Sequence, residues 1–298
     1  MNPEVERSVP HEGEPGDAVP PEAAAFADLL LRRGLLVAVI AVVVLSLVSR
    51  LEIWDALGIP IFLLLLPALA VAQLPLMRHQ RIDRRAIYVG SIVTIIGVGI
   101  VGGGLAARLG VRTAFGFGAA DAWTFFAWTG GLSAAGIAVT GLSLLTDRGG
   151  SGERERFLVQ LLPRTGPERG LFAFLSLAAG VGEELAYRGY ALAALQLLPI
   201  GPWAAAVVSS LAFGLLHAYQ GPLGVARTAV VGFVFAIGVL LSGSLLPAMA
   251  AHAIVDLLAG LVLGPVLIRR IGEGEDSHGP QVRPTSEPPP LDPRPPAG

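Results

Sequence analysis

Residues 170–197 read GLFAFLSLAAGVGEELAYRGYALAALQL, a run apolar enough to cross a bilayer that nevertheless holds three charged side chains. These are the adjacent carboxylates of Glu183 and Glu184 and the guanidinium of Arg188. A charge at bilayer depth costs at least ~2.5–3.5 kcal/mol on insertion scales, so such groups face the protein interior and need partners there. The run therefore predicts a membrane-embedded helix with a buried cluster of ionisable groups.

The composition of the whole chain indicates the same class of protein. Of its 298 residues, 53% are hydrophobic and only 15% are charged, which is typical of a multi-span membrane protein. A formal net charge of -2, without basic and aromatic patches, argues against a nucleic-acid partner. The chain has no cysteine, which excludes disulfides, thiolate catalysis and cysteine-based zinc sites.

Eight apolar runs are long enough to span a bilayer, at about 17–25 residues each. We place them at residues 30–49, 57–77, 86–107, 121–145, 170–197, 202–219, 222–242 and 244–268. The short connections Gln220-Gly221-Pro222 and Ser242-Gly243-Ser244 are typical of tight turns between antiparallel helices. The sequence thus predicts an all-α polytopic transmembrane bundle of about eight spans.

The polar segments divide this bundle into parts. We expect residues 1–28 to form a disordered N-terminal tail and residues 271–298 a disordered, Pro-rich C-terminal tail. Residues 29–148 would supply four supporting spans, and residues 149–169 a polar cytoplasmic loop. The chemistry-bearing helical core then covers residues 170–270.

Arginine placement predicts the orientation, because cytoplasmic loops carry the excess of positive charge. With the N-terminus inside, the inner segments hold most of the arginines, including Arg32, Arg33, Arg78, Arg81, Arg84, Arg85, Arg148, Arg154, Arg156, Arg164, Arg169, Arg269 and Arg270. The outer loops hold Arg50, Arg108 and Arg112. We therefore predict a multi-pass protein of the cell membrane with both termini in the cytoplasm.

Helical spacing groups the ionisable side chains. Residues four apart share a helix face, so Glu184 and Arg188 can form an ion pair while Glu183 points about 100° away, free to face a wet cavity. The same spacing places His252 and Asp256 on one face of the last span. These groups, with an imidazole from the sixth run, would form one catalytic cluster supported by the Glu184–Arg188 pair.

That further imidazole is His217, near the end of the sixth run. Counting ~1.5 Å per residue from the inner helix ends puts Glu183 and Asp256 near mid-membrane but His217 only a turn or two from the inner surface. An active site that opens toward the cytoplasmic half of the membrane would reconcile the two depths, and we predict such a site.

Two kinds of hydrolytic chemistry fit this cluster, and the sequence leaves both open. A divalent metal such as zinc would polarise a carbonyl and activate water, with ligands from Glu183, His217, His252 and Asp256. Without a metal, Glu183 would activate water directly, and the histidines and Asp256 would stabilise the oxyanion of a tetrahedral intermediate.

The order of these motifs resembles the CPBP family, which includes CAAX prenyl endopeptidases and bacterial relatives linked to bacteriocin processing and self-immunity. The resemblance covers about residues 170–268 and depends on Glu183-Glu184-x-x-x-Arg188, Phe213-x-x-x-His217 and His252-x-x-x-Asp256. It implies that Glu183 activates water, that both histidines are active-site imidazoles, and that Asp256 stands where many members carry Asn. An Asp there would favour a bound cation more than an amide does.

We therefore expect an intramembrane endopeptidase that acts on membrane-associated or lipidated peptides, in contact with membrane lipids. Two other functions stay open. A non-catalytic membrane protein, such as an immunity or scaffolding factor, could keep the buried cluster for binding. A proton-coupled transporter could use Glu, Arg and His as a relay, although no inverted internal repeat favours it.

Overall fold

The computed structural model describes residues 19–49, 51–77, 82–110, 121–146 and 157–269, and all secondary structure in these ranges is helical. Seven helical segments are long and apolar enough to cross a membrane: Pro21–Val48, Ile53–Met77, Arg84–Arg108, Ala122–Ser143, Gly166–Leu195, Ala218–Ser242 and Leu246–Arg269. The predicted all-α polytopic bundle is confirmed. Residues 1–18 and 270–298, most of the two predicted tails, lie outside the described residues.

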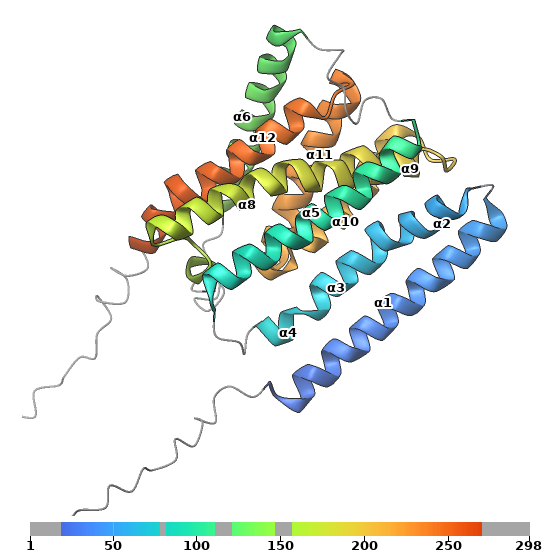
Figure 1. Ribbon diagram of the computed structural model, residues 1–298, viewed down its shortest axis with the longest axis horizontal. Helices are drawn as coiled ribbons and strands as arrows, with labels where there is room; N and C mark the ends of the chain where they lie inside the picture. Colours follow the sequence, from blue (N-terminus) through green and yellow to red (C-terminus); the bar gives the residue numbers. More distant parts are fainter. Residues whose placement is uncertain (1–18, 50, 78–81, 111–120, 147–156, 270–298) are drawn as a thin grey trace, which may run out of the picture.

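Several spans are built from consecutive helical pieces (Figure 1). The first half of the chain contains α1 (Pro21–Val48), α2 (Ile53–Pro60), the π-helix η1 (Ile61–Leu65), α3 (Leu66–Ala72), α4 (Leu74–Met77), α5 (Arg84–Arg108) and α6 (Ala122–Thr146). The second half contains α8 (Gly166–Glu184), the π-helix η3 (Leu185–Ala191), α9 (Leu192–Leu195), α10 (Pro202–Leu216), the 3₁₀ turn η4 (Ala218–Gln220), α11 (Gly221–Ser242), α12 (Leu246–Leu257) and the π-helix η5 (Leu258–Leu263).

The sixth apolar run differs from the prediction of a full span. Helix α10 has 15 residues, which gives a length of about 22 Å at 1.5 Å per residue, short of the ~30 Å hydrocarbon core. It ends at Leu216, and after the η4 turn Gly221 takes a φ of 76°, a conformation that suits glycine. In the part of the chain that the structure describes, seven long helices and one short one thus replace the eight full spans.

Two helices begin inside segments that were predicted to be a tail and a loop. Helix α1 starts at Pro21, inside the tail predicted for residues 1–28, and α8 starts at Gly166, inside the loop predicted for 149–169. Proline at the first helical position favours α1, and a capping box between Thr165 and Glu168 favours α8. Both first turns are polar, so a count of apolar residues misses them.

Helix α8 occupies the centre of the second half, packed between α5 and α12 (Figure 1). Glycines allow this close approach. A Cβ on Gly182 would lie 2.7 Å from the carbonyl oxygen of Ile95, and a Cβ on Gly180 would lie 2.7 Å from that of Met249. Small residues therefore let the backbones of three helices meet, as is common between helices in lipid.

Gly182→Ala is expected to destabilise the protein, because its new methyl group would press on backbone atoms of α5, which cannot move aside as a side chain can. Overpacking of this kind costs about 1–3 kcal/mol. Gly104→Ala is the matched control, since a Cβ there would meet nothing within 4 Å. Thermal unfolding in detergent measures the stability of each variant. Equal unfolding midpoints for Gly182→Ala and Gly104→Ala would contradict the close packing at Gly182.

Three π-helical segments interrupt the spans in the described ranges, and periodicity did not predict them. The wider i→i+5 turn leaves carbonyl groups without their usual helical donors. At η1 and η3 hydroxyl groups also donate to backbone carbonyls: Tyr187 donates to the Phe62 carbonyl at 2.9 Å, and Ser209 donates at 3.0 Å to the Tyr187 carbonyl, which accepts from the backbone N–H of Leu192 as well. These bonds tie η3, which follows Glu184 directly, to the second span and to α10.

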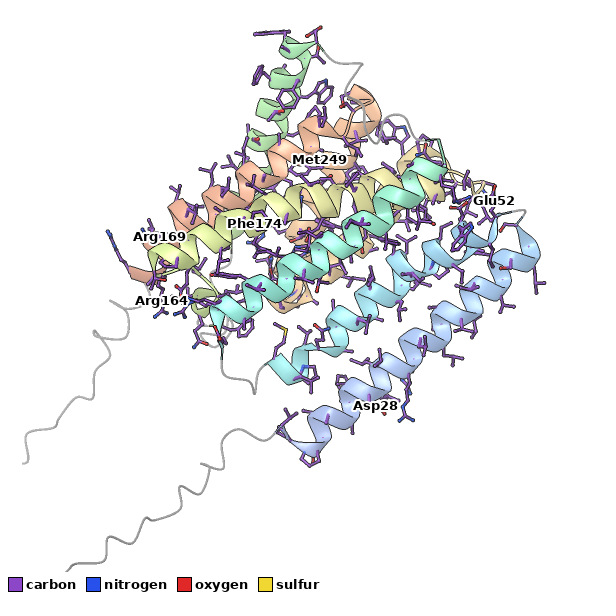
Figure 2. All side chains as sticks on the ribbon, viewed as in Figure 1. Asp28, Glu52, Arg164, Arg169, Phe174 and Met249 are labelled. Atoms are coloured by element: carbon purple, nitrogen blue, oxygen red, sulfur yellow. The ribbon has the colours of Figure 1, made fainter. Side chains whose placement is uncertain are left out.

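The two ends of the bundle carry different charged groups. Arg164 and Arg169 lie at one end and Glu52 at the opposite end (Figure 2). At the Glu52 end, Arg108 forms ion pairs with both Glu52 and the buried Asp55. The charge pattern of the sequence did not mark Asp55 as a buried carboxylate. The placement of both termini in the cytoplasm stays a prediction.

Candidate active site

The centre of the site is Glu184, whose side chain is 0% exposed. Its Oε1 atom accepts a hydrogen bond from Nη1 of Arg188 at 2.9 Å, so the predicted ion pair is formed. The same oxygen lies 2.8 Å from Nδ1 of His252. Because a carboxylate only accepts, that nitrogen carries the proton and donates it. Glu184 therefore links Arg188 of η3 to the imidazole of α12.

The guanidinium of Arg188 is held by two further helices. Its Cζ atom lies 4.3 Å from the centre of the Phe213 ring of α10, a cation–π contact. On α11, a Cβ at Gly232 would lie 2.8 Å from Nη2 of Arg188, so this position leaves room for the guanidinium only while it is glycine. Phe213 belongs to one of the quoted motifs, and its contact with Arg188 gives it a physical role.

Glu183 and Asp256 lie on the Nε2 side of the His252 ring, whereas Glu184 lies on its Nδ1 side. The Nε2 atom of His252 is 3.7 Å from Oε2 of Glu183 and 3.7 Å from Oδ2 of Asp256. Oε2 of Glu183 is buried and has no hydrogen-bond partner among the residues that the structure describes. A buried carboxylate oxygen without a donor is costly, so Glu183 has an unfilled capacity to accept a proton or a water.

His217 joins the site through its position just after α10. Its Nδ1 atom lies 3.2 Å from the Phe213 carbonyl oxygen, which only accepts, so Nδ1 is the protonated nitrogen. In the neutral ring, Nε2 then carries a lone pair. The ring centres of His217 and Phe213 are 5.0 Å apart, and Phe213 also packs edge-on against His252. Phe213 thus separates the two imidazoles that the sequence placed together.

Two cavities border these side chains. The larger one has a volume of about 910 Å³ and is lined in part by Glu183, His217, Tyr219 and Asp256. A smaller cavity of about 140 Å³ is lined in part by His217, His252 and Asp256. Four of the six predicted residues therefore lie on cavity walls, while Glu184 and Arg188 lie behind them in the protein interior.

The larger cavity extends away from the site toward one end of the bundle. Its walls include Ile87 in the first turn of α5 and Leu161 just before α8. Arg84 and Glu168 form an ion pair at this end, 3.1 Å apart, where Arg164 and Arg169 also lie (Figure 2). The cavity therefore reaches the arginine-rich end, and the short α10 brings His217 to the same space as Glu183 and Asp256.

The predicted metal ligands do not converge in the manner of a metal site. In the described ranges of the chain, no three His, Asp or Glu side chains are arranged to hold a metal ion. Glu184 binds Nδ1 of His252, so Nε2 is the ring nitrogen that faces the carboxylates of Glu183 and Asp256, each 3.7 Å away. The choice between a metal-dependent and a metal-free mechanism stays a prediction.

The sequence analysis also missed several polar residues of the larger cavity. Tyr219 accepts a hydrogen bond at its hydroxyl from Nε2 of Gln220, 3.1 Å away, and Gln220 in turn accepts from Arg227. All three line the larger cavity. The only signal for two of them was the predicted turn, which contains Gln220 and directly follows Tyr219.

One comparison with known proteins gives a match. Residues 167–258 match the family model described as type II CAAX prenyl endopeptidase Rce1-like, and all six predicted site residues fall within that range. No curated protein and no solved structure matches the chain. Residues 167–258 are therefore similar to an Rce1-like type II CAAX prenyl endopeptidase domain, which is consistent with the resemblance to the CPBP family.

Proposed function

We propose that this chain is an intramembrane endopeptidase that hydrolyses a peptide bond of a membrane-associated peptide, with Glu183 as the general base. One observation carries the proposal. A buried carboxylate oxygen of Glu183 has no hydrogen-bond partner in the described structure, and it lies beside His252 on the wall of a cavity large enough for a peptide segment. A water molecule in that cavity would supply the missing donor.

The reaction follows from this placement. Glu183 accepts one proton from water, and the water oxygen forms a bond to the carbonyl carbon while the carbonyl π electrons move onto oxygen. The tetrahedral intermediate then expels the amine. As the C–N bond breaks, Glu183 returns the proton to the leaving nitrogen, so the carboxylate is regenerated and one water is consumed.

Glu184 and Arg188 are positioning residues in this scheme. Their ion pair is buried, and Glu184 also binds Nδ1 of His252, which fixes the ring with Nε2 toward Glu183 and Asp256. Two cations, Arg188 and a protonated His252, then face three carboxylates. Protonated His252 can donate from Nε2 to the oxyanion, which we take to be its role.

His217 serves the nucleophile in this proposal. Since Nδ1 donates to the Phe213 carbonyl, Nε2 of the neutral ring can accept a hydrogen bond from the attacking water. Glu183 and His217 line the same cavity and can hold one water between them. Two acceptors would orient both water protons away from the substrate and leave an oxygen lone pair directed at the carbonyl carbon.

The substrate class follows from the family description and the cavity. A CAAX prenyl endopeptidase acts on peptides with a prenylated cysteine near the C-terminus. The larger cavity is lined mainly by apolar side chains away from the site, such as Ile87, Leu161 and Leu267. We therefore propose a lipidated peptide as substrate, presented from the surrounding membrane lipids.

We route no step through a metal, because no three candidate ligands in the part of the chain that the structure describes are grouped to hold one. The proposed reaction needs only water and the side chains of the site. Elemental analysis of the purified protein, paired with cleavage assays after treatment with a chelator, checks this. Stoichiometric zinc whose removal abolishes cleavage would overturn the metal-free scheme.

The test of the function is hydrolysis in ¹⁸O-labelled water. The purified protein in lipid vesicles is given a peptide ending in a farnesylated Cys-Val-Ile-Met sequence. We expect mass spectrometry to detect cleavage, with one ¹⁸O atom in the new carboxylate, because water supplies the nucleophile. Tight binding without cleavage would favour an immunity or scaffolding role, and proton-dependent solute uptake by the vesicles would favour a transporter.

A further inference from the structure

In the proposed site, Asp256 is a carboxylate at a position where a hydrogen-bond donor to the oxyanion would be useful. Asp256 lies 3.7 Å from His252, on the cavity wall where the oxyanion would form. An ionised carboxylate at position 256 only accepts hydrogen bonds, so it does not supply the donor to an oxyanion that an amide would. Nδ1 of His252 donates to Glu184, and Nδ1 of His217 donates to Phe213. Oxyanion stabilisation by more than one donor therefore needs a group outside the predicted cluster.

Tyr219 offers such a group. It lies in the 3₁₀ turn η4, two residues after His217, and the centres of the two rings are 6.1 Å apart. A backbone hydrogen bond from Gln220 to the His217 carbonyl, at 2.9 Å, closes this turn. Tyr219 lines the larger cavity together with Glu183 and Asp256. The early end of α10 thus brings the phenol and the imidazole to the same wall.

The hydrogen bonds around Tyr219 prepare its hydroxyl to donate. Its oxygen accepts from Nε2 of Gln220 at 3.1 Å, so the phenolic proton is not used in that bond. The carbonyl oxygen of the same Gln220 side chain accepts from Arg227, which fixes which end of the amide faces Tyr219. Hydrogen bonds in such a chain polarise one another, so the Arg227–Gln220–Tyr219 series strengthens the phenol as a donor.

We propose that Tyr219 is a further catalytic residue, whose hydroxyl donates a hydrogen bond to the scissile carbonyl oxygen as negative charge develops there. The proton stays on the phenol, and no covalent bond is made or broken at Tyr219. The role replaces the donor that an amide at position 256 would supply. This inference rests on the proposed hydrolysis with Glu183 as base.

The Tyr219→Phe variant tests the proposed catalytic role of Tyr219, because the change removes only the hydroxyl. Removing one oxyanion donor lowers kcat by about 10²–10³-fold. We expect that loss with KM changed less than about twofold, since the bond forms in the transition state rather than on substrate binding. The probe is the farnesylated Cys-Val-Ile-Met peptide in vesicles, with initial rates measured over a range of peptide concentrations.

Tyr190→Phe is the matched control. It removes a hydroxyl that lies 3.4 Å from Asp55, among the charged groups at the Glu52 end of the bundle, and it should retain the wild-type kcat. Binding of uncleaved peptide, measured in a Glu183→Gln background with and without Tyr219→Phe, should be equal.

The outcomes separate the two proposals. A wild-type kcat in Tyr219→Phe would overturn the catalytic role of Tyr219 while hydrolysis by Glu183 stands. A rise in KM, weaker binding of the uncleaved peptide or a lowered unfolding midpoint, with kcat unchanged, would assign Tyr219 to binding or packing and also overturn it. Undiminished cleavage by Glu183→Gln would instead remove the base on which both proposals depend.

Discussion

Glu183→Gln is expected to lower kcat for the farnesylated peptide by at least about 10³-fold, within the 10²–10⁴-fold range of general-base catalysis. The amide has nearly the same shape as the carboxylate but cannot take a proton from water. Its unfolding midpoint should match or exceed that of the wild type, because the change removes a buried charge whose Oε2 atom lacks a hydrogen-bond partner in the described structure. Steady-state kinetics and thermal unfolding measure the two effects separately.

Glu168→Gln, on the same helix as Glu183, is expected to have the opposite effects: lower stability and an unchanged kcat. Glu168 accepts hydrogen bonds from the backbone of Arg164 and Thr165 and pairs with Arg84, away from the cavity walls. Loss of this charged cap should cost about 1–3 kcal/mol of stability and leave kcat unchanged. If Glu183→Gln lowered stability as Glu168→Gln does and retained activity, Glu183 would be a structural carboxylate and the proposed base would be wrong.

Arg188→Met is expected to be among the most destabilising single changes in the chain. It leaves Glu184, which is 0% exposed, without the cation that neutralises it. Breaking a buried ion pair from one side costs about 3–5 kcal/mol. The contact between the guanidinium and Phe213 is lost as well. Thermal unfolding in detergent, with the folded fraction followed by size-exclusion chromatography, measures the loss.

The double variant Glu184→Met/Arg188→Met separates stability from activity. Replacing both partners of a buried ion pair with apolar residues of similar volume is often neutral or stabilising, so the unfolding midpoint should recover much of the loss. Cleavage should stay low, because His252 loses the carboxylate that holds its Nδ1. Full recovery of both properties would show that Glu184 has no part in orienting the imidazole.

Much of the site was visible in the pattern of charges along the chain. Polar residues inside apolar runs are rare enough to mark a cluster, and the four-residue spacing of Glu184 and Arg188 predicted a contact that the structure contains at 2.9 Å. The fold class followed from hydropathy for the same reason, since each span must be apolar over most of its length.

Other features of the fold and the site depend on contacts between helices, and these contacts do not show in the hydrophobic periodicity of the sequence. The π-helical segments η1, η3 and η5, and the early end of α10, interrupted spans that the apolar pattern continued. The binding of Nδ1 of His252 by Glu184 joins residues 68 positions apart. No local rule indicates which imidazole nitrogen faces a carboxylate, because that depends on how closely α8 and α12 pack through Gly180.

Residue order and hydropathy were sufficient to specify a polytopic helical bundle with acidic and imidazole side chains in its core, because burying charge in lipid constrains which residues a span can hold. Which of these side chains line a cavity and which lie behind its walls was decided by packing in three dimensions. Glu184 and Arg188 lie behind the cavity walls while Glu183, His217 and Tyr219 line the larger cavity, and this follows from the depth at which α10 ends and from glycines that let α8 approach its neighbours.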